Sequence, residues 1–97
     1  MAGKALGVME LKSVGVLMQA TDIMAKVADI EVADYERIGS AQVAIFIRGE
    51  IQACEAAIKA ATEFVTKSAK DRFVTSFVIP DPHEKLGLVF RINPDKR

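Results

Sequence analysis

The segment Val43–Ile47 constrains the fold most, because all five of its residues are apolar. In an extended strand successive side chains point to opposite faces, so both faces of this strand are apolar and both need to be buried. We therefore predict a strand over Gln42–Arg48 at the centre of a sheet. The 97 residues of the chain have room for one compact domain around such a sheet.

Before this strand, the spacing of apolar residues changes from a strand pattern to a helix pattern. Over Ala5–Lys12 a period of two predicts a strand, with one face formed by Leu6, Val8 and Glu10 and the other by Gly7, Met9 and Leu11. Over Val14–Asp29 the apolar residues recur at steps of three and four, which predicts an amphipathic helix with Ser13 as its N-cap. Asp22 precedes Lys26 by four residues, the favourable orientation for a helical ion pair. The predicted apolar stripe consists of Val16, Leu17, Ala20, Ile23, Met24 and Val27.

The middle of the chain predicts a hairpin followed by a second helix. A strand over Ile30–Ile38 is joined to the central strand by Gly39-Ser40-Ala41, where glycine favours a tight turn. A helix is predicted over Glu50–Lys67, again from apolar residues at steps of three and four. Its stripe consists of Ile51, Cys54, Ile58, Ala61 and Val65.

The last predicted strand is Phe73–Ile79, which follows a polar connector at Thr66–Arg72 and ends at Pro80. A helical turn is expected over Asp81–Gly87. Leu88–Ile92 is expected to form a short strand or to lie against the body of the domain before the charged end of the chain. The side chains expected on one face of the last strand are Phe73, Thr75, Phe77 and Ile79.

The order of these elements is β-α-β-β-α-β. With right-handed crossovers it predicts an α/β (α+β) fold of the ferredoxin-like kind, in which helices cover one side of a four-stranded sheet that contains antiparallel pairs. We expect a single domain over residues 1–97 with no linker or internal repeat.

The balance of charges excludes several classes of partner. Thirteen basic residues match thirteen acidic ones, and no aromatic cluster is interleaved with arginine, so we expect no nucleic acid and no anionic membrane as a partner. No apolar run approaches the roughly 18 residues of a membrane span. The single cysteine, Cys54, allows no disulfide within the chain, so the reducing cytosol is the expected location.

The residues that carry most enzyme chemistry are scarce. Cys54 lies on an apolar helix stripe, where a buried structural thiol is expected, and the single histidine, His83, has no second histidine or cysteine with which to bind zinc. The carboxylates around positions 29–36 are interpreted as solvated positions. Neither a phosphate-binding loop nor a dinucleotide motif is present. We therefore predict no enzymatic activity, no cofactor and no metal site.

Several local patterns together resemble one protein family. The sequence is similar to the hexameric shell proteins of bacterial microcompartments in motifs that follow the family's order over residues 5–88, which leaves 89–97 as a C-terminal tail. These motifs are Ala5-Leu6-Gly7-Val8-Met9-Glu10, Ala20-Thr21-Asp22-Ile23-Met24-Ala25-Lys26, Tyr35-Glu36-Arg37-Ile38-Gly39-Ser40, Ile47-Arg48-Gly49-Glu50 and Val78-Ile79-Pro80-Asp81-Pro82-His83.

The resemblance implies a structural role and an assembly. Copies of such a domain form a homo-hexameric disc, and the discs tile edge to edge into the shell of a cytoplasmic microcompartment. The implied partners are other shell proteins of the same compartment, the enzymes that it encloses, and small metabolites that cross a central pore.

The resemblance also assigns roles to particular residues. The family's pore turn falls on Ile38-Gly39-Ser40, preceded by Arg37 where many relatives carry lysine. The family's edge lysine falls on Lys26, and the edge between hexamers is expected to include Asp29, Asp81 and His83. Many relatives carry arginine at the position of Asp81. Since an aspartate accepts hydrogen bonds and donates none when ionised, pairing of Asp81 with Lys26 is an alternative to the usual contact.

Two other functions fit the same order of elements. A trimeric ferredoxin-like regulator would bind a metabolite between its subunits, because this topology serves many small sensors. A small enzyme with a site shared between subunits is the third alternative. Fold alone does not separate these from a shell protein.

Overall fold

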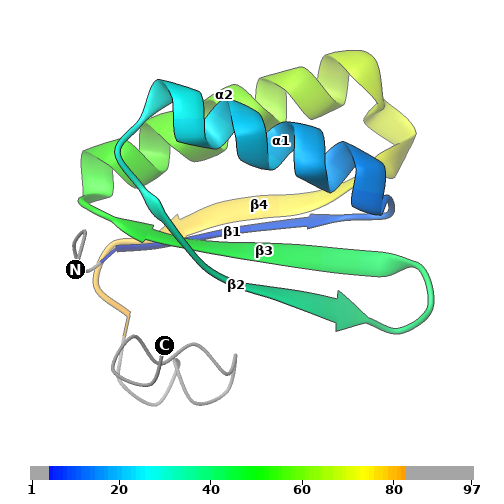
Figure 1. Ribbon diagram of the computed structural model, residues 1–97, viewed down its shortest axis with the longest axis horizontal. Helices are drawn as coiled ribbons and strands as arrows, with labels where there is room; N and C mark the ends of the chain where they lie inside the picture. The colour runs from blue at the N-terminus through cyan, green and yellow to red at the C-terminus, as the bar shows by residue number, and fades with distance from the viewer. Residues whose placement is uncertain (1–4, 83–97) are drawn as a thin grey trace.

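The computed structural model describes residues 5–82, which form two layers (Figure 1). One layer is a four-stranded sheet and the other consists of two helices that lie side by side on the same face of the sheet. The elements are β1 Ala5–Leu11, α1 Val14–Val27, β2 Glu31–Ile38, β3 Gln42–Gly49, α2 Ile51–Ser68, a short 3-10 helix Lys70–Arg72 and β4 Phe73–Ile79.

The strands are ordered β2-β3-β1-β4, and every neighbouring pair is antiparallel. Each helix connects two strands that are separated by one other strand, which is the ferredoxin-like arrangement. The predicted fold class and element order are therefore confirmed. The predicted turn over Asp81–Gly87 falls mostly, and the strand over Leu88–Ile92 wholly, outside the described residues.

Strand β3 is central, as its sequence predicts. All five residues of Val43–Ile47 are buried, and none is more than 7% exposed. Val43, Ile45 and Ile47 belong to the main core under the helices, whereas Ala44 and Phe46 form a smaller cluster with Leu6 and Val8 on the opposite face. Burial of a Val, Ile or Phe side chain contributes about 1.5–3 kcal/mol to stability. The sheet order therefore depends strongly on this strand.

Helix α1 begins where it was predicted and ends earlier. The Ser13 hydroxyl accepts a hydrogen bond from the Val16 N–H at 3.1 Å, a cap of the kind that contributes about 1 kcal/mol. Ala28 is already extended, so the helix stops at Val27 instead of Asp29. Val27 is 51% exposed, so its expected place on the buried stripe is wrong.

Helix α2 is longer at its C-terminal end than the sequence suggested. Glu50 is its N-cap and lies outside it, and the helix continues to Ser68. The hydroxyl of Thr66 donates to the backbone carbonyl of Thr62, so it stays within the helical ladder. The polar connector predicted over Thr66–Arg72 is therefore helical for most of its length. A polar sequence at the exposed end of a helix has the same composition as a loop, which is why the prediction placed a connector there.

Strand β4 contains an irregularity that its alternation did not reveal. The register of β1 and β4 shifts between Glu10 and Leu11. Phe73 consequently packs against the main core under the helices, whereas Ile79 packs against the cluster on the opposite face. The prediction that Phe73 shares a face with Ile79 is wrong, since a bulge changes the side to which the following residues point.

Gly7 lets side chains of β3 and helix α2 pack closely on strand β1. A Cβ atom at Gly7 would lie 2.7 Å from Cγ1 of Ile47 and 3.1 Å from Cγ1 of Ile58, so an alanine has no room. We predict that Gly7→Ala lowers the free energy of unfolding by about 1–3 kcal/mol through overpacking. Urea denaturation followed by circular dichroism at fixed protein concentration measures this change.

Gly15→Ala is the matched control. Gly15 lies in α1, and the nearest atom to an added Cβ is Oγ of Ser13 at 3.8 Å. Alanine should raise stability there by up to about 1 kcal/mol, because it favours helix. If both variants behaved alike, the close approach of α2 to β1 at Gly7 would not limit packing.

Candidate functional site

The turn between β2 and β3 projects from one end of the sheet (Figure 1). Ile38 pairs with Gln42, which leaves Gly39, Ser40 and Ala41 to reverse the chain, as predicted. Gly39 has φ +67°, a left-handed conformation that residues with a Cβ rarely adopt. Because all three turn residues are exposed, their backbone groups are accessible to solutes.

The residues just before the turn point to opposite faces of the sheet. Arg37 pairs with Val43, which belongs to the core on the helix side, and its own side chain is exposed. Ile38 is 42% exposed. Within residues 5–82 the Arg37 guanidinium makes no ion pair, so it is available to solutes or to another chain. The structure thus brings the four sequence-predicted pore residues together at one hairpin tip.

The expected edge residues lie at the other end of the sheet. Lys26 occupies the last turn of α1 and Asp29 follows it, while Asp81 follows β4 directly. Strand β4 ends at Ile79, opposite Leu6 at the start of β1, whereas the β2–β3 turn adjoins the end of β1. Lys26, Asp29 and Asp81 are all exposed. The remaining predicted edge residue, His83, lies outside the described residues.

Lys26 forms the ion pair that the helix spacing predicts. Its Nζ lies 2.9 Å from Oδ2 of Asp22, and the two side chains are 72% and 64% exposed. An exposed pair of this kind contributes only about 0.3–0.5 kcal/mol. Pairing of Lys26 with Asp81 stays a prediction for contacts between copies.

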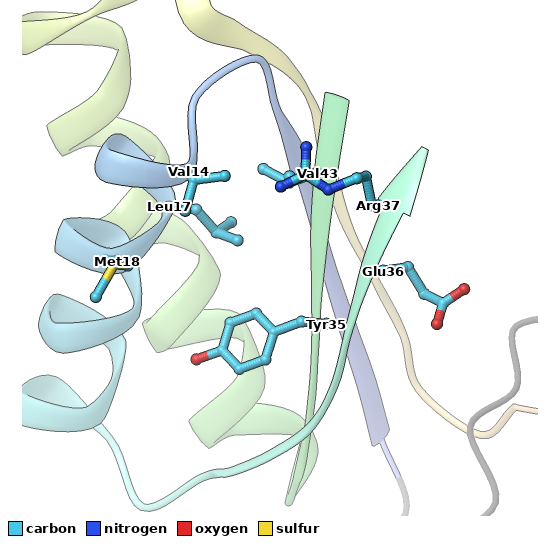
Figure 2. A pocket seen from close by; sticks show the side chains of 7 residues that line it. All are labelled: Val14, Leu17, Met18, Tyr35, Glu36, Arg37 and Val43. Atoms are coloured by element: carbon cyan, nitrogen blue, oxygen red, sulfur yellow. The ribbon is translucent and has the colours of Figure 1, made fainter. Parts of the chain in front are cut away.

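A pocket of about 300 Å³ lies between α1 and β2, beside the turn (Figure 2). The Tyr35 ring points toward α1, and the Arg37 side chain extends on the same side, while Glu36 points away. The pocket is lined by Val14, Leu17, Met18, Tyr35, Glu36, Arg37 and Val43.

The sequence alone does not reveal this pocket. Met18 is an apolar residue outside the predicted stripe of α1, and it is 66% exposed. The position of Met18 on the otherwise polar face of an amphipathic helix was the one sign in the sequence of an apolar surface there. A pocket that forms between distant elements is not visible in periodicity.

Cys54 is buried, as its place on the helix stripe predicts. Its Sγ donates to the Ala5 carbonyl oxygen at 3.7 Å. Burial raises the pKa of the Cys54 thiol, and the nearby Arg48 charge opposes this only in part. A thiol that remains protonated is a poor nucleophile. Its role is therefore packing between α2 and β1.

Residues 5–82 contain neither a candidate metal centre nor a candidate membrane-spanning helix. No group of three or more His, Cys, Asp or Glu side chains is placed to hold a metal ion there. None of the helices in this part of the chain is both long and apolar enough to cross a membrane.

Comparison with known proteins identifies the family. Residues 5–82 match the family model of the BMC domain. The carboxysome shell protein CcmK4 of Synechococcus elongatus is 34% identical over 92 residues, which cover 95% of this chain and 81% of the relative. The microcompartment shell protein PduA of Citrobacter freundii is 35% identical over 85 residues, which cover 86% of this chain and 87% of PduA.

A solved structure agrees with these relatives. The crystal structure of a microcompartments protein from Desulfitobacterium hafniense is similar with a TM-score of 0.79 and 26% sequence identity, over 91% of this chain. The chain spans about half of that protein, 49% of its length. The two-layer fold is thus similar to that of a microcompartments protein. This chain belongs to the BMC domain family.

Proposed function

We propose that this chain is a structural tile of a bacterial microcompartment shell, in which six copies form a ring around a central pore. The observation that carries the proposal is the placement of the candidate residues. The hairpin tip with Arg37 and Ser40 lies at one end of the sheet, and Lys26, Asp29 and Asp81 lie at the other. A ring needs one end of each copy at the axis and the other at the rim.

The relatives support the structural role. CcmK4 and PduA are both shell proteins, and each is matched over more than four fifths of its length. We infer that this chain, like them, is a shell protein. We also infer that it assembles with other shell proteins around enclosed enzymes in the cytoplasm and has no enzymatic activity of its own.

Six-fold symmetry would determine the chemistry of the pore. The chain has no net charge, yet one Arg37 per copy would place a ring of positive charges near the axis. The exposed N–H groups of the turn and the Ser40 hydroxyl would offer hydrogen bonds to small polar solutes. We infer that the pore favours small anionic or neutral polar metabolites over cations.

Ser40→Leu tests the pore. Leucine would replace the hydroxyl at the hairpin tip with an apolar group and narrow the opening, so the flux of a small anionic solute should fall by at least about tenfold. Rings reconstituted in planar bilayers or liposomes measure this flux.

Gln19→Leu, which places the same side chain at an exposed position of α1, is the control and should keep the flux of the wild type. Unchanged flux through intact Ser40→Leu rings would overturn the assignment of the pore.

Lys26→Asp tests the rim. We expect isolated rings to form normally and two-dimensional sheets to disappear in electron micrographs, because a carboxylate replaces the long cationic side chain at every edge. Within the protomer the change removes the Asp22–Lys26 ion pair and places two carboxylates four residues apart, which together cost about 0.5–1 kcal/mol and leave the helix folded.

Lys59→Asp is the matched control, since Lys59 is an exposed lysine of α2. It makes the same change of charge, and sheets should persist. Sheets formed by Lys26→Asp rings would show that Lys26 has no part in the edge contact.

A further inference from the structure

Helix α2 presents a row of charged side chains whose signs alternate. The side chains follow one another at steps of four residues, so they are neighbours along one side of the helix. They lie on the side that faces away from the buried residues of α2, on the outer surface of the helical layer (Figure 1). All are exposed, and this α2 charge row consists of Glu55, Lys59, Glu63 and Lys67.

The α2 charge row makes no ion pair among the described residues. Within residues 5–82 none of its side chains lies near an opposite charge, whereas Nζ of Lys26 and Oδ2 of Asp22, which have the same spacing in α1, are 2.9 Å apart. Ala56 is exposed beside the row, and its short side chain leaves room for a second helix to approach. The charged groups of the row are therefore available to another chain.

The order of the charges makes the row complementary to its own reverse. When two copies of α2 meet antiparallel across a two-fold axis, Glu55 faces Lys67 and Lys59 faces Glu63. Every charge then has its opposite across the contact, in an isologous arrangement. When the two helices meet in parallel, each charge faces a like charge, which is repulsive. An antiparallel second copy is thus the occupant that the row fits.

We propose that the α2 charge row is the surface through which two layers of tiles associate face to face, with α2 of one layer docked antiparallel on α2 of the other. The contact rests on the proposed function. An exposed ion pair is weak by itself, and only tiled layers repeat it from ring to ring. The contact is separate from the hairpin tip and from the rim at Lys26.

The direction of α2 determines how the layers are placed. Gly49, just before α2, pairs with Ala5 at the start of β1, whereas the 3-10 helix after α2 bonds to Lys12 beyond the end of β1. In the proposed ring every α2 therefore runs from the rim toward the axis. Two rings stacked on one axis would bring parallel helices together, with like charges facing. The antiparallel contact therefore requires facing rings to be offset, so that their pores do not share an axis.

Lys59→Glu tests the contact. Across the two-fold axis the introduced carboxylate faces Glu63 of the second copy, so the share of sheet area that is two layers thick should fall by at least about tenfold. Lys59 is exposed, so the protomer should keep its fold, which circular dichroism checks. Atomic force microscopy distinguishes single from double layers by their height.

Lys70→Glu is the matched control, because Lys70 is exposed and lies outside the row, in the 3-10 helix. It makes the same change of net charge and should leave the double layers in place. Equal loss of double layers in both variants would show that net charge controls stacking, and it would overturn the contact.

Lys59→Glu combined with Glu63→Lys should restore the double layers to within about threefold of the wild type, because the exchanged charges again face their opposites across the two-fold axis. Within one helix the double variant places a glutamate beside Glu55 and a lysine beside Lys67, so better helix stability cannot explain a restoration. A double variant that stacks no better than Lys59→Glu would contradict the antiparallel arrangement.

A carbodiimide crosslink checks the arrangement independently. This reagent joins an amine to a carboxylate without a spacer, and Lys67 and Glu55 of one helix are about 18 Å apart along its axis. A link between them thus requires two copies, and mass spectrometry of crosslinked double layers should detect it. Its absence there would overturn the contact. Wild-type sheets that are one layer thick throughout would also overturn the contact and leave the proposed function intact, whereas absence of both rings and sheets would overturn the two together.

Discussion

Burial of β3 on both faces is the constraint on which the rest of the structure depends. Val43, Ile45 and Ile47 pack under the helices, and Ala44 and Phe46 pack on the other side, so β3 has to be an interior strand. Its partners are β1 and β2, and both helices then cross the same face of the sheet. The loss of β3 burial would cost several times the roughly 1.5–3 kcal/mol of one side chain, on the scale of the whole stability of a small domain.

The same constraint separates the two ends of the molecule. The β2–β3 connection has only Gly39, Ser40 and Ala41 with which to reverse direction, and Gly39 adopts the left-handed conformation that this needs. The hairpin tip is therefore held beyond the end of β1. The C-terminal ends of α1 and β4 lie at the far end of the sheet. In the proposed ring the hairpin tip would lie at the axis and the far end of the sheet at the rim.

The sequence predicted the parts of the fold that local chemistry determines, and it missed those that depend on tertiary geometry. The central position of β3, the Ser13 cap and the glycine turn follow from single residues and their period. The side on which Phe73 lies depends on a bulge against β1, and the exposure of Val27 depends on where α1 stops. For the site, the residues alone indicated only a hairpin at Gly39. The pore role came from the resemblance to the family, and the pocket at Met18 and Tyr35 required two distant elements to be placed together.

In the proposed function, copies of this chain assemble into rings that tile edge to edge. Negative-stain electron microscopy of the purified protein over a range of concentrations tests it most directly. We expect discs with six-fold symmetry that join edge to edge into flat arrays at higher concentration. Discrete three-fold particles that never form arrays would contradict it and favour a trimeric metabolite-binding regulator.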